Sequence, residues 1–267
     1  MGTEQKPGPL VIIGGAEDRE GDCLVLREFV RAAGGVNARI AIMTAATTLP
    51  EEVGDDYVRI FERLGAEEIE IVYTERREDS DREDTLKQVK EATGIFFTGG
   101  DQSRIVDFIK GTPLDRLIHK RHQEGAVIAG TSAGAAMMPD QMIVGGASVS
   151  NASVDAVEMG PGMGFMPGIV VDQHFAERGR LGRLLAALAL QPAVLGLGID
   201  EDTAIIVDGD EFQVIGRGAV TVVDETGATY SNLEGVLRDE MLALFNVKLH
   251  ILPQGYRFNL KTHTPIA

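Results

Sequence analysis

The residues best suited to chemistry form a five-residue motif, Gly130-Thr131-Ser132-Ala133-Gly134. It fits the G-x-S-x-G pattern, in which a nucleophilic serine sits on a strained turn between a strand and a helix. The apolar run 126–129 before it predicts the required strand. In this arrangement the backbone N–H of Ala133 points at the oxyanion that forms when Ser132 attacks a carbonyl carbon. The alternative is a tight glycine turn with a serine that caps the helix.

A nucleophilic serine needs a base, and the chain has five histidines. His174 follows the apolar stretch 168–171 and has polar neighbours, so it is expected at the end of a strand and is the preferred base. The others are expected on a solvated helix face, in a strand near the end of the chain and in a loose tail: His119 and His122, His250, and His263.

A third residue must orient the histidine. The apolar segment 195–199 is followed by Asp200-Glu201-Asp202, and the spacing leaves all three as candidates. The order serine, histidine, acid differs from the serine, acid, histidine order of α/β-hydrolases, and no HGGG-type loop is present. Gly99-Gly100 is the comparable glycine pair before the serine motif, and its N–H groups are candidates for the second oxyanion donor.

These residues have to be positioned by a sheet. Short apolar runs alternate with amphipathic segments, which predicts parallel strands joined by helices on both faces. The expected strands are 10–13, 39–43, 69–72, 94–97 and 126–129, and the expected helices are 24–33, 53–64, 85–92 and 114–124. The active site of such a sheet lies beyond the carboxyl ends of its strands. Glu17 and Asp18, which follow Gly14-Gly15, are expected either to line this crevice or to form a solvated turn.

The last third of the chain has a different character. After a helix expected over 180–190, short apolar segments with tight turns predict an antiparallel section packed on one end of the sheet. Its expected strands are 194–199, 204–207, 212–215, 220–223 and 247–252. No linker or repeat interrupts the sequence. The prediction is a single α/β domain over 1–267, with a mostly parallel central sheet, helices on both faces and a small antiparallel β section near the C-terminus.

Composition narrows the possible partners and compartments. A net charge of -16, from 41 acidic and 25 basic residues, argues against binding nucleic acid. The single cysteine, Cys23, excludes an intramolecular disulfide and a cysteine metal cluster and fits a reducing, cytoplasmic compartment. The first residues lack a signal-peptide pattern, and no apolar run approaches the roughly 20 residues of a membrane span. No metal or organic cofactor is expected.

Five stretches together resemble the serine peptidase family that contains cyanophycinase and aspartyl dipeptidase. They are IIGGAEDRE, FFTGGDQ, GTSAGA, DQHFAERGRLGRL and GIDEDTA, spread over about residues 11–207. The resemblance implies a fold like that of class I glutamine amidotransferases with serine in place of cysteine, a triad of Ser132, His174 and Glu201, and a homodimer. It also implies an exopeptidase that uses an acyl-enzyme. The implied substrate is cyanophycin, a poly-aspartate with arginine on each β-carboxyl, and the implied product is the β-aspartyl-arginine dipeptide.

A cluster of arginines beside His174 suits such a substrate. Cations at the start of a helix oppose its dipole, so Arg178, Arg180 and Arg183 suggest forked pairing with substrate carboxylates rather than a plain basic surface. Further polar candidates for holding the substrate's guanidinium or amide groups are Asp101, Gln102, Asp172 and Gln173. Two other functions stay open: a dipeptidase acting on small α-aspartyl peptides, and a non-catalytic protein that binds an amino-acid-like ligand.

Overall fold

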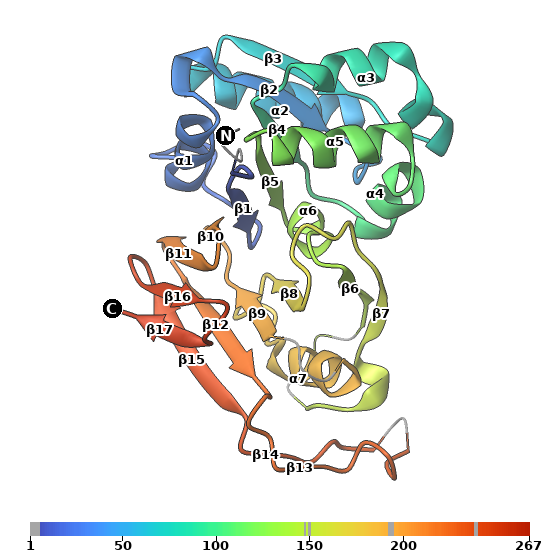
Figure 1. The fold of residues 1–267 in the computed structure, drawn as a ribbon, viewed down its shortest axis with the longest axis vertical. Coiled ribbons are helices and arrows are strands. Elements are labelled where there is room, and N and C mark those ends of the chain that lie inside the picture. Colours follow the sequence, from blue (N-terminus) through green and yellow to red (C-terminus); the bar gives the residue numbers. More distant parts are fainter. Residues whose placement is uncertain (1–5, 147, 149–150, 192–194, 238–239) are drawn as a thin grey trace, which may run out of the picture.

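A nine-stranded sheet forms the centre of the molecule (Figure 1), in the order β17-β16-β11-β10-β1-β5-β4-β2-β3. The computed structural model describes residues 6–146, 148, 151–191, 195–237 and 240–267. The first five strands are parallel: β1 (Leu10–Ile13), β2 (Arg39–Met43), β3 (Glu68–Val72), β4 (Gly94–Phe97) and β5 (Val127–Thr131). The antiparallel strands on the other side are β10 (Thr203–Asp208), β11 (Glu211–Gly216), β16 (Arg257–Asn259) and β17 (Thr264–Ile266). The predicted α/β class is confirmed.

Helices cover both faces of the parallel strands, because alternate side chains of each strand enter different cores. One core contains Val11 and Ile13 and is covered by α1 (Leu24–Ala32) and α2 (Pro50–Arg63). The other contains Leu10 and Ile12. It is covered by α3 (Glu83–Lys90), α4 (Gln102–Ile109), α5 (Pro113–Gln123) and α6 (Ala133–Ala136). Helix α4 was not expected from the sequence.

A second sheet of four strands, in the order β15-β12-β9-β8, lies below the first in Figure 1. Its strands are β8 (Ile169–Gln173), β9 (Leu195–Ile199), β12 (Ala219–Asp224) and β15 (Lys248–Pro253). Only β8 and β9 pair in parallel, and α7 (Leu181–Leu190) packs against them. The antiparallel section near the C-terminus is thus confirmed, but its strands are divided between two sheets. Residue 194, the expected start of β9, lies outside the described residues.

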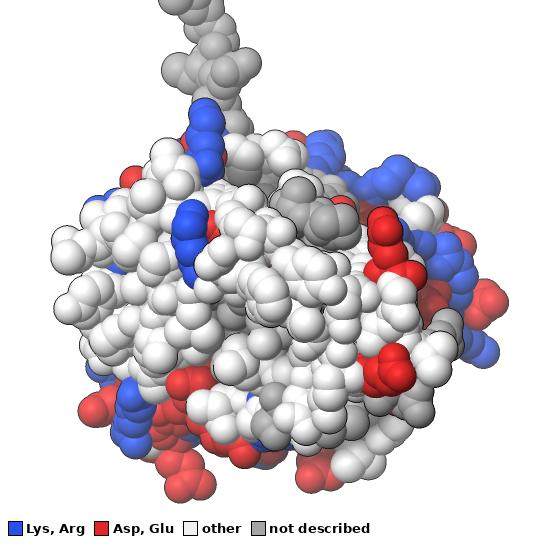
Figure 2. All heavy atoms as spheres, turned by 90° about the horizontal axis from the view of Figure 1, so that it is seen from below, with Lys and Arg blue, Asp and Glu red and all other residues white. Residues whose placement is uncertain are grey.

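Smaller elements complete the chain. They are the strand pair β6 (Gln141–Gly145) and β7 (Glu158–Pro161), the strand pair β13 (Tyr230–Ser231) and β14 (Leu244–Phe245), and three short 3-10 helices at Gly35–Asn37, Arg77–Asp81 and Val154–Ala156. The β13–β14 pair forms the lower end of the molecule in Figure 1. Figure 2 looks at this end and shows that charged side chains lie mostly around its rim.

Two expectations about histidines were wrong. His122 does not face solvent: it is 8% exposed, and its Nε2 lies 2.8 Å from the carbonyl oxygen of Gly8. Burial lowers the pKa of His122. His263 is not in a loose tail, because its Nδ1 lies 3.3 Å from a carboxylate oxygen of Asp224 and the strand β17 follows it. Both partners, Gly8 and Asp224, are far away in the chain, so the local sequence around each histidine did not indicate them.

Glu225, directly after β12, makes stability depend on pH. Its Oε1 is buried without a hydrogen-bond partner in the described part of the chain, and burial raises the pKa of Glu225 from 4.5 to about 7. The folded protein therefore holds this proton at pH values where the unfolded chain has released it. The free energy of unfolding consequently falls as the pH rises from about 4.5 to about 7.

We expect Glu225→Gln to remove this dependence. After allowance for the partial solvent exposure of Glu225, the variant should raise the free energy of unfolding by about 1–2 kcal/mol at pH 8 and change it little at pH 4. Urea unfolding at the two pH values measures both effects. Glu234→Gln, at an exposed carboxylate, is the matched control. An equal gain from Glu225→Gln at both pH values would contradict this account.

Candidate active site

Ser132 lies between β5 and α6 with a backbone that most residues avoid. Its φ is 53° and its ψ is -108°, so a non-glycine residue adopts a positive φ and the turn is strained. The flanking glycines permit this path, since a Cβ on Gly130 would lie 2.2 Å from the carbonyl oxygen of Gly134. The N–H of Ser132 donates to the carbonyl oxygen of Ile13 at 3.0 Å, which ties the turn to β1.

His174 follows β8 in the second sheet and reaches the serine across the junction between the sheets. Its Nε2 lies 3.0 Å from Ser132 Oγ. Its backbone N–H donates to the carbonyl oxygen of Gly14 at 2.8 Å. The imidazole packs directly on Gly15, where an added Cβ would lie 2.4 Å from Cε1 of the ring. Gly15 is therefore needed because the histidine ring occupies the space of a side chain, and Gly14 is needed because a Cβ there would lie 2.0 Å from the carbonyl oxygen of Asp200.

Glu201 contacts the far side of the imidazole. Its Oε1 lies 2.5 Å from His174 Nδ1. Because β8 and β9 are parallel, with Gln173 beside Ile199, the residues after both strands meet at one edge. The two acidic neighbours of Glu201 are used elsewhere.

Asp200 accepts hydrogen bonds from the backbone N–H groups of Ala176 and Ala219, at 3.1 and 3.0 Å. Asp202 accepts from the N–H of Asp18 at 2.8 Å and pairs with Arg217. Glu201 is therefore the member of this acidic trio that touches the imidazole, a choice that spacing alone left open. With Nδ1–H donated to a carboxylate, Nε2 is free to accept the serine proton.

Two segments adjoin Ser132: the Gly99-Gly100 turn and the next residue, Ala133. A Cβ on Gly99 would lie 3.5 Å from Ser132 Cβ, so the Gly99-Gly100 turn borders the nucleophile. Within the described ranges, the N–H groups of Gly99, Gly100 and Ala133 donate no hydrogen bond. Ala133 is only 1% exposed, and buried N–H groups are rarely left unpaired. The site thus has free donors next to the atom that would attack a carbonyl group.

Asp101 and Gln102 connect the Gly99-Gly100 turn to its surroundings. Asp101 is exposed and accepts a hydrogen bond from the N–H of Ser103 at 2.8 Å, which caps α4. The Gln102 side-chain nitrogen donates to the carbonyl oxygens of Ile143 and Val144, at 2.9 and 2.8 Å. The amide donors of Gln102 are therefore occupied by β6.

The predicted arginine cluster is organised around Asp172, whose side chain is 1% exposed. Arg183 donates to both carboxylate oxygens of Asp172, from Nε at 2.9 Å and from Nη2. Arg180 donates from Nη1 to Asp172 at 3.3 Å and to Gln173 Oε1 at 3.0 Å, and burial lowers the pKa of Arg180 to about 10. The Arg180 Nη2 group has no partner among the residues that the structure describes, and Arg178 is exposed. Two buried arginines share one carboxylate, which leaves excess positive charge beside His174.

The question left open for Glu17 and Asp18 has two different answers. Asp18 is a turn residue: it accepts hydrogen bonds from the N–H groups of Gly21, Cys23 and Glu20, and these lower the pKa of its carboxyl group. The Glu17 side chain has no exposed surface. It neither lines the crevice nor forms a solvated turn, and sequence reasoning found no signal for its burial.

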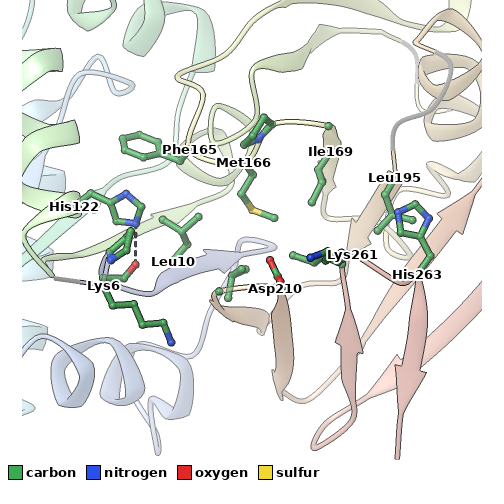
Figure 3. Close-up of a pocket in the computed structure, with 17 residues that line it drawn as sticks. Lys6, Leu10, His122, Phe165, Met166, Ile169, Leu195, Asp210, Lys261 and His263 are labelled. Atoms are coloured by element: carbon green, nitrogen blue, oxygen red, sulfur yellow. Dashed lines mark hydrogen bonds between the residues drawn. The ribbon is translucent and has the colours of Figure 1, made fainter. Parts of the chain in front are cut away.

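A cavity of about 390 Å³ lies at the opposite ends of the strands (Figure 3). Leu10, Ile169 and Leu195, the first residues of β1, β8 and β9, line it. Ser132, His174 and Glu201 instead follow the last residues of their strands, or come two residues later, at the edge where α/β sheets bind ligands. Among the described residues, no cluster of three or more His, Cys, Asp or Glu side chains suits a metal ion. None of the described helices has the length and apolar character of a membrane span.

Comparison with known proteins places this geometry in a family. Peptidase family S51 matches residues 10–215. The cyanophycinase of Geminocystis herdmanii is 43% identical over 260 residues, which cover 97% of this chain and 96% of that protein. The cyanophycinase of Trichormus variabilis is 42% identical over 257 residues, covering 96% of this chain and 86% of that protein.

Solved structures share the fold. A peptidase from an acI-B1 Actinobacterium superposes with a TM-score of 0.69 at 23% identity, over 96% of this chain and 98% of that one. At that identity the likeness concerns the fold alone. Taken with the full-length relatives and the family match, it leads to one conclusion: the chain belongs to peptidase family S51 and is a serine-type peptidase.

Proposed function

We propose that this peptidase hydrolyses the backbone of cyanophycin, with Ser132 as nucleophile, His174 as base and Glu201 as its orienting acid. The observation that carries the proposal is the continuous hydrogen-bonded chain from Ser132 Oγ through the imidazole to Glu201, with contacts of 3.0 and 2.5 Å. The choice of cyanophycin as substrate rests on the similarity to the two cyanophycinases described above.

The proposed reaction passes through an acyl-enzyme. Ser132 Oγ attacks the scissile carbonyl carbon while His174 Nε2 takes the serine proton, and Glu201 stabilises the charged imidazole. The N–H groups of Ala133 and of Gly99 or Gly100 hold the oxyanion. His174 then returns its proton to the leaving amine as the C–N bond breaks. Water, deprotonated by His174, hydrolyses the ester and regenerates the serine.

Substrate recognition is assigned to the charged groups around the triad. Arg180, through the Nη2 group that has no partner among the described residues, and the exposed Arg178 are proposed to pair with the carboxylate at the free end of the poly-aspartate backbone. Asp172 and Arg183 hold Arg180 in place together with Gln173. The exposed Asp101 is proposed to accept a substrate guanidinium. Binding at a chain end would release β-aspartyl-arginine dipeptides, and the net charge of -16 would attract the substrate's arginines.

Product analysis tests this function. Wild-type enzyme and Ser132→Ala are each incubated with cyanophycin, with unsubstituted poly-α-aspartate and with small α-aspartyl dipeptides, and products are identified by mass spectrometry. We expect β-aspartyl-arginine from cyanophycin with the wild type alone. Cleavage of the small dipeptides but not of cyanophycin would move the function to aspartyl dipeptidase. No cleavage, and no labelling of Ser132 by a fluorophosphonate, would leave a non-catalytic binding protein.

Two features outside the site remain predictions. A homodimer is proposed on the family resemblance, and sedimentation analysis of the purified chain at micromolar concentration would test it. The same sample, probed by limited proteolysis, tests whether residues 1–267 behave as one domain. Separable stable fragments would contradict the single-domain prediction.

A further inference from the structure

Glu17 is hydrogen-bonded to Thr131, the residue before Ser132, and takes part in none of the steps above. It stands on the segment between β1 and α1, and its side chain has no exposed surface. Its Oε2 accepts a hydrogen bond from the hydroxyl of Thr131 at 2.5 Å. Thr131 is the last residue of β5, is 1% exposed and immediately precedes Ser132. A buried carboxylate is thus bonded to the neighbour of the strained serine.

The other oxygen of Glu17 is held just as firmly. Its Oε1 accepts from the hydroxyl of Tyr57 at 2.5 Å and from Arg19 Nε at 3.1 Å. The Arg19 guanidinium also lies 4.7 Å from the centre of the Tyr57 ring. Tyr57 is fully buried in α2, and burial raises the pKa of its hydroxyl well above the ordinary value, so it remains a donor at neutral pH. Both carboxylate oxygens therefore have short, directional partners.

Burial of a carboxylate with an ionic partner, as at Glu17, contributes little to the free energy of unfolding. The desolvation of a buried ion pair offsets most of its attraction, and apolar residues of similar volume often serve folding as well or better. A buried, fully bonded carboxylate does fix geometry, because each of its hydrogen bonds has a preferred direction. The location of Glu17 shows which geometry it fixes.

The segment that carries Glu17 also touches the base. The carbonyl oxygen of Gly14 accepts the N–H of His174 at 2.8 Å, and the imidazole packs on Gly15. One residue before this pair, the carbonyl oxygen of Ile13 accepts the N–H of Ser132. Residues 13–17 therefore contact the backbone of Ser132 and both the backbone and the imidazole of His174, and Glu17 joins this segment to Thr131 of β5.

We infer that Glu17 is a positioning residue, which holds Thr131 and the strained turn after it so that Ser132 Oγ stays within proton-transfer distance of His174. The inference rests on the proposed role of Ser132 as nucleophile. Proton transfer depends steeply on such placement: a misplacement of about 1 Å can cost roughly 100-fold in rate. Loss of the Thr131–Glu17 bond should therefore slow the chemical step rather than weaken substrate binding.

Thr131→Val tests the inference, since valine keeps the shape of threonine and removes only the hydroxyl. We expect kcat, and the rate at which a fluorophosphonate labels Ser132, to fall by about 10- to 100-fold, while KM changes by less than about twofold. Thr131→Ser restores the hydroxyl and should return both rates to within about threefold of wild type. Val127→Ala, a cavity variant at the start of the same strand, controls for lost stability.

The outcomes are distinguishable. Labelling of Thr131→Val at the wild-type rate would overturn the positioning role. The role would also be overturned if Val127→Ala lost as much stability and as much labelling rate as Thr131→Val. The slower labelling would then follow from lost stability and not from the missing hydroxyl. If the wild type itself is not labelled, Ser132 is not an activated nucleophile, and the proposed function fails before the question of Glu17 arises.

Discussion

Ser132→Ala is expected to lower kcat by about 10⁴- to 10⁶-fold and to leave KM for cyanophycin nearly unchanged. In the proposed mechanism the hydroxyl forms the covalent bond to the substrate, so its removal would eliminate the acyl-enzyme route. The substitution removes the hydrogen bond between Ser132 Oγ and His174 Nε2. Arg178 and Arg180, the main groups proposed to bind substrate, take no part in that bond, so substrate binding should be retained. Initial rates of dipeptide release over a range of polymer concentrations separate the two constants.

The double variant Ser132→Ala/His174→Ala gives a sharper test of whether the two side chains work together. If Ser132 and His174 act as one unit through their 3.0 Å contact, as proposed, His174→Ala should lower kcat about as much as Ser132→Ala, and the two substitutions together should lower it no more than either alone. Additive losses would show that the two side chains act independently. Circular dichroism of each variant checks that the fold is retained. Residual activity in His174→Ala at the wild-type level would remove histidine from the mechanism.

Gly15→Ala is expected to reduce kcat by about 10²- to 10³-fold, although the glycine carries no reactive group. The added Cβ would lie 2.4 Å from Cε1 of His174, so either the ring or the backbone has to move. A shift of the ring would disturb its contacts with Ser132 at Nε2 and with Glu201 at Nδ1. The predicted signature is a slower labelling of Ser132 by a fluorophosphonate in a protein that is still folded.

A second glycine provides the control. Gly65 has a φ of +95°, close to the +99° of Gly15, and a Cβ there would meet nothing within 4 Å. Gly65→Ala therefore imposes a comparable backbone strain, about 1–2 kcal/mol, without touching the imidazole. It should lower thermal stability and keep wild-type kcat. If Gly15→Ala and Gly65→Ala behave alike, strain and not the collision with His174 explains the result.

The strands were easier to predict than their pairing. Buried parallel strands are short, nearly continuous apolar runs, and β1, β2 and β4 have the predicted bounds. The division of the last strands between two sheets could not be read in this way. The apolar segments β9 and β10 look alike in sequence, yet one joins the second sheet and the other pairs with β1. Pairing is decided by contacts between distant segments, which a local pattern does not contain.

The site shows the same contrast. The G-x-S-x-G spacing identifies Ser132 because a strained turn requires small neighbours, a local property. The choice of Glu201 over Asp200 depended on family resemblance, and the contact with His174 appears only where β8 and β9 meet. Glu17 was expected to line the crevice or to form a solvated turn, and its burial was not predicted, since its partners Thr131 and Tyr57 are 114 and 40 residues away in the chain. Burial of a charged group is a tertiary property.

The proposed nucleophile and its proposed base follow strands of different sheets. Ser132 follows β5 of the nine-stranded sheet, whereas His174 and Glu201 follow neighbouring strands of the four-stranded sheet. A small rotation of one sheet against the other would part the serine from the imidazole but carry the base and its acid along together. The alignment of Ser132 with His174 therefore depends on contacts that join the two sheets, such as the hydrogen bond from the His174 N–H to the carbonyl oxygen of Gly14, whereas the pairing of His174 with Glu201 depends on neighbouring strands of one sheet.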